Sequence, residues 1–330
     1  MLLDEVQLLR DFPDVLIDLN SIEGVDVYVT GSNAKLLSRD VVTEFRGRGQ
    51  EIRMAPLSFS EFMGAYSGDK RDGYEEYAMY GGLPAVLARE TPEEKVAYLK
   101  GLYDELYIRD IVDGNHVRDE GNLEALIDIL SSAIGSLTNS SRLSATFKSE
   151  MHVTIAPETV DRYISYLTDA FLVSRAKRYD IKGRKYIGSP YKFYFTDLGL
   201  RNARMNFRQM EPTHIMENVI YNELAARGFG VDVGVANTSV KGARGTYQRA
   251  QLEIDFICNK GSQRFYVHSA YSLSDEAKVA QEQRPFKKVD DNFKKIIITK
   301  EGFAPHYNAD GVLMMNVYDF LLDPDSLSAL

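Results

Sequence analysis

The sequence contains one cysteine, Cys258, no fixed-period repeat and no Gly/Ser-rich linker. A single cysteine excludes a disulfide framework and a multi-thiolate metal site, and it fits a reducing compartment. No apolar run approaches the roughly 18 residues of a membrane span. The amino terminus, MLLDEVQLLRDF, is acidic and lacks the charge order of a signal peptide. We therefore expect a cytoplasmic protein without a membrane partner.

The chain has 330 residues, of which 44% are apolar and 26% charged, so it is long enough for one large domain or for two to three ordinary ones. Its net charge of -9 argues against general adhesion to nucleic acid. The charge is uneven, because residues 142–205 contain 12 Lys/Arg and 6 Asp/Glu. This local basic excess predicts that the middle of the chain has a different partner from the ends.

Residues 1 to about 120 form the first of three blocks. Two β-rich runs, MLLDEVQ and VDVYVTGSN, flank a helix-like stretch, which is typical of parallel strands in an α/β sheet. Ser58, followed three residues later by Glu61, predicts a capped helix start. Residues 74–112 are predicted to be helical apart from a break at Gly81–Pro84.

Acidic and polar side chains follow the two predicted strands of this block. In Leu2-Leu3-Asp4-Glu5, the first carboxylate suits Mg²⁺ and the second suits the orientation of an attacking water. The second strand ends in polar groups able to contact a γ-phosphate, and two loop arginines follow. These further candidates are Thr30, Ser32, Asn33, Arg46 and Arg48. The alternative is a strand running into a solvated turn, with the arginines as solvated loop charges.

Taken in order, the acidic motif, TGSN, the GR arginine and the PLSF-EF helix resemble the prokaryotic AAA-type ATPases. Members of this family also carry a winged helix and a C-terminal restriction-endonuclease-like domain of unknown function. The resemblance extends over essentially the whole chain. It implies ATP and Mg²⁺ as cofactors and ATP-driven handling of DNA or protein. The implied catalytic residues are Asp4, which also holds the metal, Glu5, Asn33 and Arg48, and the implied nucleotide-binding residues are Thr30 and Ser32.

The sequence departs from that family at the phosphate loop. The pattern G-x-x-x-x-G-K-[ST], whose backbone N–H groups and lysine provide most of the phosphate binding, occurs nowhere in it. We therefore expect a truncated family member that by itself neither binds ATP tightly nor hydrolyses it. A partner chain supplying the loop, or further copies of this chain, would complete the site. We also expect exposed apolar surface in the first block.

Residues 121–205 have the order of a winged-helix module: helical segments, a strand, a basic turn and a second strand. The predicted recognition helix covers Pro157–Leu167. Its outer face carries Arg162 with Thr159 and Ser165, and its inner face carries Val160, Tyr163, Ile164 and Leu167. Lys182, Arg184 and Lys185 are the predicted phosphate contacts of the wing. The alternative is a module that only packs domains or subunits together.

Residues 206–330 are predicted to form a further α/β domain. Glu217 on a helix and Asp255 in the strand LEIDF resemble the metal-binding carboxylates of restriction-endonuclease-like folds, with Glu253 as a third. Active members place an acid and a lysine on the next strand, where this chain has His268-Ser269-Ala270. A hard cation would be poorly held by this remnant, so we expect little nuclease chemistry.

The fold class predicted from the sequence is multidomain α/β. It comprises a partial parallel-sheet AAA-type core with a helical lid (1–120), a winged helix (121–205) and a nuclease-like domain (206–330). Three functions compete: an ATPase-like protein that is inactive alone, a DNA-binding or assembly module without catalysis, and a metal-dependent nuclease.

Overall fold

The computed structural model describes residues 1–6, 9–31, 50–103, 108–208, 210–241 and 247–328. Its helices are α1 Phe12–Asn20, α4 Phe59–Ala65, α5 Lys70–Tyr80, α6 Pro84–Leu87, α7 Pro92–Leu102, α8 Arg109–Asn115, α9 Glu120–Ser132, α10 Ser140–Glu150, α11 Pro157–Asp169, α12 Leu198–Arg204, α13 Pro212–Ala226, α14 Glu276–Gln283, η4 Phe286–Lys288 and α15 Val317–Leu322. Its strands are β1 Leu2–Leu3, β2 Tyr28–Val29, β3 Val173–Asp180, β4 Lys185–Phe195, β5 Gly230–Lys241, β6 Tyr247–Lys260, β7 Gln263–Ala270, β8 Lys294–Thr299, β9 His306–Tyr307 and β10 Leu313–Asn316. Within these ranges, every helix is too short or too polar to cross a lipid bilayer.

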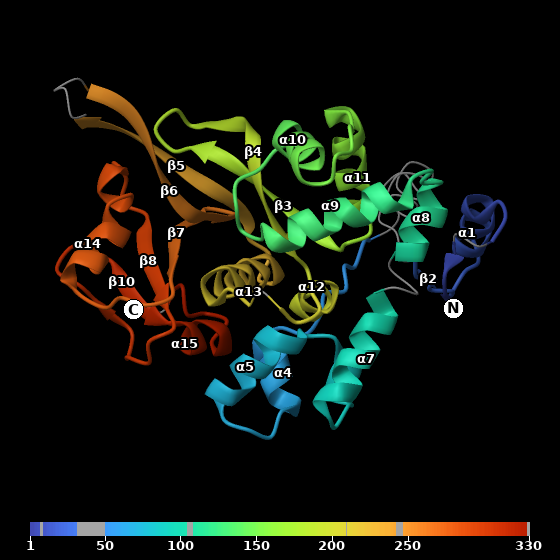
Figure 1. The fold of residues 1–330 in the computed structure, drawn as a ribbon. Coiled ribbons are helices and arrows are strands. Elements are labelled where there is room, and N and C mark those ends of the chain that lie inside the picture. Colours follow the sequence, from blue (N-terminus) through green and yellow to red (C-terminus); the bar gives the residue numbers. More distant parts are fainter. Residues whose placement is uncertain (7–8, 32–49, 104–107, 209, 242–246, 329–330) are drawn as a thin grey trace.

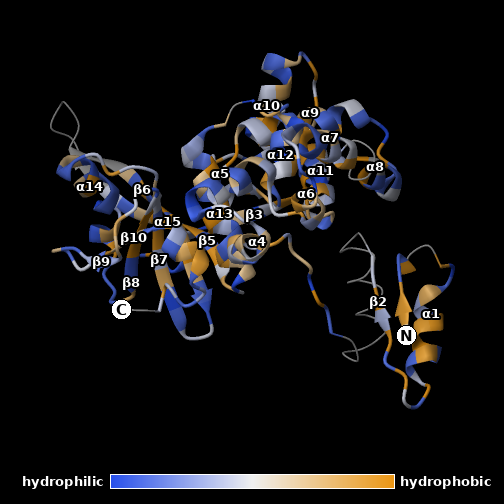
Figure 2. Ribbon diagram, turned by 90° about the horizontal axis from the view of Figure 1, so that it is seen from below, coloured by the Kyte–Doolittle hydropathy of each residue, from blue (hydrophilic) through white to orange (hydrophobic). Residues whose placement is uncertain are grey.

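The N-terminal unit consists of β1, α1 and β2. The two strands pair in parallel, as the strand–helix–strand pattern predicted, and α1 packs on them through Phe12 and Leu16. Figure 2 shows this unit apart from the other helices, and the exposed segment 50–55 leads from it toward α4. Large apolar side chains stay exposed here, including Leu2 at 72% and Tyr28 at 59%, which confirms the expected apolar surface.

The helices α4 to α12 all contribute buried side chains to one large apolar core, which they share with strands of the main sheet. The predicted helix start at Ser58 is confirmed. The Ser58 Oγ accepts the Glu61 N–H at 3.3 Å, and a Glu61 carboxylate oxygen accepts the Ser58 N–H at 2.8 Å, so both members of the capping box are formed. The predicted faces of α11 are also confirmed, because Val160, Tyr163 and Ile164 are buried.

The main sheet has eight strands in the order β4-β3-β5-β6-β7-β8-β10-β9. The β3–β4 hairpin is antiparallel, and β3 pairs in parallel with β5, where Arg178 lies opposite Val233. Parallel pairs also join β7 to β8 and β8 to β10. The sheet is therefore mixed, and the hairpin of the middle block is one edge of the sheet formed by the C-terminal block (Figure 1).

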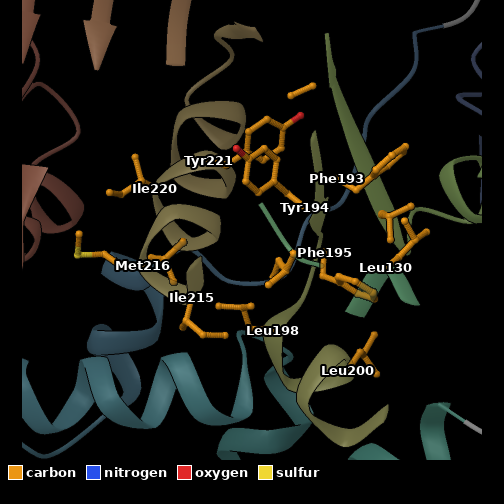
Figure 3. Packing of buried hydrophobic residues seen from close by; sticks show 14 of the residues in the cluster. Leu130, Phe193, Tyr194, Phe195, Leu198, Leu200, Ile215, Met216, Ile220 and Tyr221 are labelled. Atoms are coloured by element: carbon orange, nitrogen blue, oxygen red, sulfur yellow. The ribbon is translucent and has the colours of Figure 1, made fainter. Parts of the chain in front are cut away.

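Helix α13 packs on one face of this sheet, against β4, β5, β6 and β7. The rings of Tyr194 and Tyr221 stack with centroids 4.2 Å apart, and both are labelled in Figure 3. The buried Asn218 side chain accepts the Phe195 N–H and donates to the Phe195 C=O, each at 2.8 Å. Because a buried amide must be satisfied, this pairing fixes the helix against the end of β4.

Candidate functional site

The two acidic and polar strand ends of the N-terminal unit meet, as expected for neighbouring parallel strands. The Thr30 hydroxyl donates a hydrogen bond to Asp4 and accepts the Glu5 N–H at 3.1 Å. Asp4 is exposed, and Glu5 has a left-handed backbone with φ of 49°. A carboxylate beside a hydroxyl is the oxygen environment that Mg²⁺ prefers. Asp4 and Thr30 therefore fit the metal end of a nucleotide site.

The rest of that site is not described. Ser32, Asn33, Arg46 and Arg48 lie outside the described residues. Mg²⁺ binds proteins through one or two carboxylates together with substrate phosphates. Those phosphates require a glycine-rich cradle and a lysine, which the printed sequence lacks. Of the predicted nucleotide site, the structure thus describes Asp4, Glu5 and Thr30.

The predicted nucleic-acid interface is exposed but weakly basic on its helix. Arg162 lies on the outer face of α11, where Glu158 and Asp161 are exposed beside it. On the hairpin, Lys182, Arg184 and Lys185 are exposed. DNA binding through these four basic residues is not tested by this geometry and stays a prediction.

Part of the basic excess of residues 142–205 serves internal contacts. Arg204 binds Asp128 and Glu124, Arg178 donates to Gln251 at 2.8 Å, and Arg201 is almost fully buried. Lys192 is buried as well. The sequence count therefore overstates the charge that this region offers to a partner.

A buried cluster of charges joins β4, β6, β7 and α13 at the predicted nuclease-like position. The Lys192 Nζ lies 2.7 Å from Glu217 Oε1, 2.7 Å from Glu253 Oε1 and 3.5 Å from Asp255 Oδ1. The Tyr194 hydroxyl donates to Glu217 at 2.6 Å. Glu217 and Asp255 are thus brought together as predicted, but with an ammonium group between them.

The second half of the cluster centres on His268. Its Nδ1 lies 2.9 Å from Asp255 Oδ2, and its Nε2 lies 2.7 Å from Glu282 Oε2 on α14. The Ser269 N–H also donates to Asp255 at 2.8 Å. His268 therefore lies between two carboxylates, with its Nε2 hydrogen-bonded to Glu282 and its Nδ1 in an ion-pair contact with Asp255.

Burial and charge shift the pKa values of this cluster in opposite directions. Burial raises the pKa of Glu217, and Lys192 only partly offsets this effect. Burial would also raise the pKa of Asp255, but the His268 and Lys192 cations bring it below its usual range. Burial would lower the pKa of His268, yet Asp255 and Glu282 raise it to about 10. The cluster is a network of ion pairs in which Asp255 stays ionised.

The arrangement does not fit a divalent cation. Among the residues that the structure describes, no three His, Cys, Asp or Glu side chains are placed to hold a metal ion. The Lys192 ammonium occupies the point where the three carboxylates converge, so a second cation there would meet its charge at close range.

Sequence reasoning missed Lys192. The signal was present in the strand YKFYF, whose other four residues are aromatic. A lysine in a strand this apolar is buried on folding, and a buried lysine is almost always paired with carboxylates. The carboxylates that pair with it lie at least 25 positions away, so the strand alone does not identify them.

The elevated pKa of His268 predicts a specific pH dependence. Its unfolded pKa is about 6.5. Because the folded value is higher, its contribution to stability is complete below that pH and is lost as pH rises toward about 10. In NMR spectra, the resonance of the His268 ring is identified as the one that the His268→Gln variant lacks. In the wild type at pH 8, we expect this resonance to be that of a charged imidazolium ring. A ring that is neutral at that pH would contradict the ion pairs, and Glu282→Gln should lower the midpoint.

Comparison with known proteins gives two family matches. Residues 1–63 match an AAA domain, and residues 71–211 match a domain of unknown function, DUF8612. An uncharacterized protein of Haemophilus influenzae is 33% identical over 97% of this chain and 77% of its own length. An uncharacterized protein of Methanocaldococcus jannaschii is 26% identical over 91% of this chain and 68% of its own length.

One solved structure is also similar in part. The crystal structure of a Vibrio cholerae protein aligns with 91% of this chain and 67% of its own, at 9% identity and a TM-score of 0.24. Because this TM-score is low, the fold is assigned from the strands and helices of this chain and not from the similarity. They form a mixed α/β architecture, as predicted, while the winged-helix and nuclease-like assignments stay predictions.

Proposed function

Since this chain belongs to the same protein family as the uncharacterized Haemophilus influenzae protein, and its first residues match an AAA domain, we propose that it is an AAA-type ATPase relative that acts by binding and assembly and does not turn over ATP by itself. The observation that carries the proposal is the strand edge at Asp4 and Thr30. It offers oxygen ligands for Mg²⁺, whereas the sequence contains no loop to hold the phosphates.

The surface of the N-terminal unit supports the assembly role. Parallel strands are normally covered on both faces, but Leu2 on β1 and Tyr28 on β2 are exposed. Apolar area of this kind marks protein contact sites in soluble proteins. A partner chain or a further copy that covers these strands would also be in position to supply the missing phosphate contacts.

Nuclease activity is a weaker proposal for this chain. The carboxylates that would gather a metal already form ion pairs with Lys192 and His268. Each cation would have to be displaced before a divalent ion could bind, and the buried lysine would then lose its partners. We therefore place the C-terminal sheet in a structural or recognition role.

The test of the proposal is ATP turnover by the purified chain. We expect the wild type to release phosphate from ATP no faster than an Asp4→Asn variant does. By calorimetry, we expect the wild type to show no micromolar affinity for Mg-ATP that is lost in Asp4→Asn. The reason is that one carboxylate and one hydroxyl cannot replace the N–H cradle. Turnover by the wild type that is lost in Asp4→Asn would overturn the proposal.

A further inference from the structure

A cavity of about 520 Å³ lies between the tip of the β3–β4 hairpin and the segment that leads from η4 into β8. Its volume falls in the range of roughly 300–1,000 Å³ that is typical of sites for small molecules. It is separate from the Asp4 edge and from the buried Lys192 cluster. Its lining residues are Tyr179, Ile181, Lys182, Arg184, Arg264, Lys288, Asp290, Asp291 and Phe293.

Three exposed cations line this cavity without an acidic partner. Lys182, Arg184 and Lys288 are exposed, and none of them forms an ion pair with a described residue. The neighbouring Lys287, in contrast, binds Asp310 at 3.0 Å. Unpaired cations that converge from two separate segments repel one another, and an anion between them would remove that repulsion. A phosphate group matches this arrangement because it accepts several charged hydrogen bonds at once.

One wall of the cavity brings a guanidinium close to two aromatic rings. The Arg264 guanidinium is held by a 2.7 Å hydrogen bond to Asn259, and its carbon lies 5.3 Å from the Phe293 ring and 5.8 Å from the Tyr179 ring. Phe293 is 40% exposed. An exposed aromatic ring beside a fixed guanidinium is the kind of surface on which nucleic-acid bases stack.

The two acidic residues restrict the ligand further. Asp291 already accepts the Tyr266 hydroxyl at 2.6 Å, while the exposed Asp290 leaves a carboxylate available to hydroxyl or amino donors. Negative charge at this side of the cavity disfavours a polyphosphate, because additional phosphates would approach it. A ligand with one phosphate, a flat ring and hydrogen-bond donors satisfies all three groups of side chains.

We propose that this cavity binds one nucleoside monophosphate unit, with the phosphate at Lys182, Arg184 and Lys288 and the base against Phe293 and Arg264. The unit is either a free nucleotide or an unpaired nucleotide of a single strand. A duplex does not supply it, because its bases are stacked inside the helix. The site is independent of the ATPase-like edge, so it stands whether or not the proposed function holds.

The test measures binding of three probes to the full chain: a short fluorescein-labelled oligothymidylate by anisotropy, and thymidine monophosphate and inorganic phosphate by calorimetry. We expect Phe293→Ala to weaken the oligonucleotide or the nucleotide about tenfold through lost stacking. Lys288→Gln should weaken it by a similar factor and should reduce the salt slope by about 1. The matched controls, Lys287→Gln and Lys287→Ala, change the residue next to the lining residue Lys288 and should bind as the wild type does.

Each outcome decides the proposal. Binding of the oligonucleotide but not the monophosphate assigns the site to single strands, and binding of the monophosphate with equal affinity assigns it to a free nucleotide. If neither binds, the proposal is wrong. It is also wrong if Phe293→Ala and Lys288→Gln bind as the controls do, or if inorganic phosphate binds as tightly as the nucleotide. A preference for duplex DNA would favour the winged-helix prediction instead.

Discussion

Lys192→Met is expected to be the most destabilising single change that leaves the shape of the core intact. The substitution removes the only ammonium among Glu217, Glu253 and Asp255 and keeps the length of the side chain. Removing one partner of a buried ion pair costs about 3–5 kcal/mol, because the remaining charges stay buried without compensation. We expect a loss of this size in the free energy of unfolding, measured with urea at pH 8.

The pH dependence of this loss separates a lost charge from lost packing. Without Lys192, the pKa of Glu217, which burial already raises, rises further above its unfolded value. Folding then takes up protons, and the stability of the variant increases as pH falls. We expect a smaller loss at pH 5 than at pH 8. The control is Lys185→Met at the exposed start of the same strand, which should change stability little at either pH. Equal losses at both pH values would show that the carboxylates are not held by the lysine.

Local patterns in the sequence were sufficient for the elements and their buried faces. Ser58 and Glu61 predicted a helix start because a capping box involves only four consecutive residues. The spacing of Val160, Tyr163 and Leu167 predicted the inner face of α11, because one helix periodicity determines it. The sequence predicted two parallel strands followed by Asp4 and Thr30, and these side chains meet because neighbouring parallel strands end at the same edge of a sheet.

Contacts between distant segments could not be predicted from local sequence patterns. The pairing of β3 with β5 joins the middle block to the C-terminal sheet, and no local pattern specifies which strand a sheet edge will accept. The role of Lys192 was not predicted for a similar reason, since its carboxylate partners come from α13 and β6. Conversely, the count of basic residues suggested a surface charge, although Arg201 and Lys192 are buried. Net charge describes composition, whereas the fold decides which charges face a partner.

Asp197→Ala is the second change for which we expect a large effect. This buried carboxylate caps α12 by accepting the Leu200 N–H at 3.0 Å, and it also accepts the Gly82 N–H at 2.8 Å from the loop between α5 and α6. Alanine would leave both N–H groups buried without acceptors, at about 1–3 kcal/mol each. We expect a total loss of about 2–6 kcal/mol in the free energy of unfolding.

The packing around Asp197 explains why the loss would not be relieved by local movement. A Cβ on Gly199 would lie 2.1 Å from the Tyr80 C=O, so α12 and the end of α5 are already in close contact. The chain therefore has little room to turn the freed N–H groups toward water. Asp197→Asn retains one acceptor oxygen, and it should lose less stability than the alanine variant.

Asp69 provides the matched control for Asp197, because it caps α5 and also accepts two backbone N–H groups, those of Arg71 and Asp72. It differs in exposure. Burial raises the pKa of Asp197 to about 6, whereas the backbone N–H groups lower the pKa of the exposed Asp69. Water can replace the cap at Asp69, so Asp69→Ala should cost clearly less. If the two alanine variants lost equal stability, helix capping alone would determine the contribution of Asp197. The buried link between α12 and the α5–α6 loop would then add nothing to it.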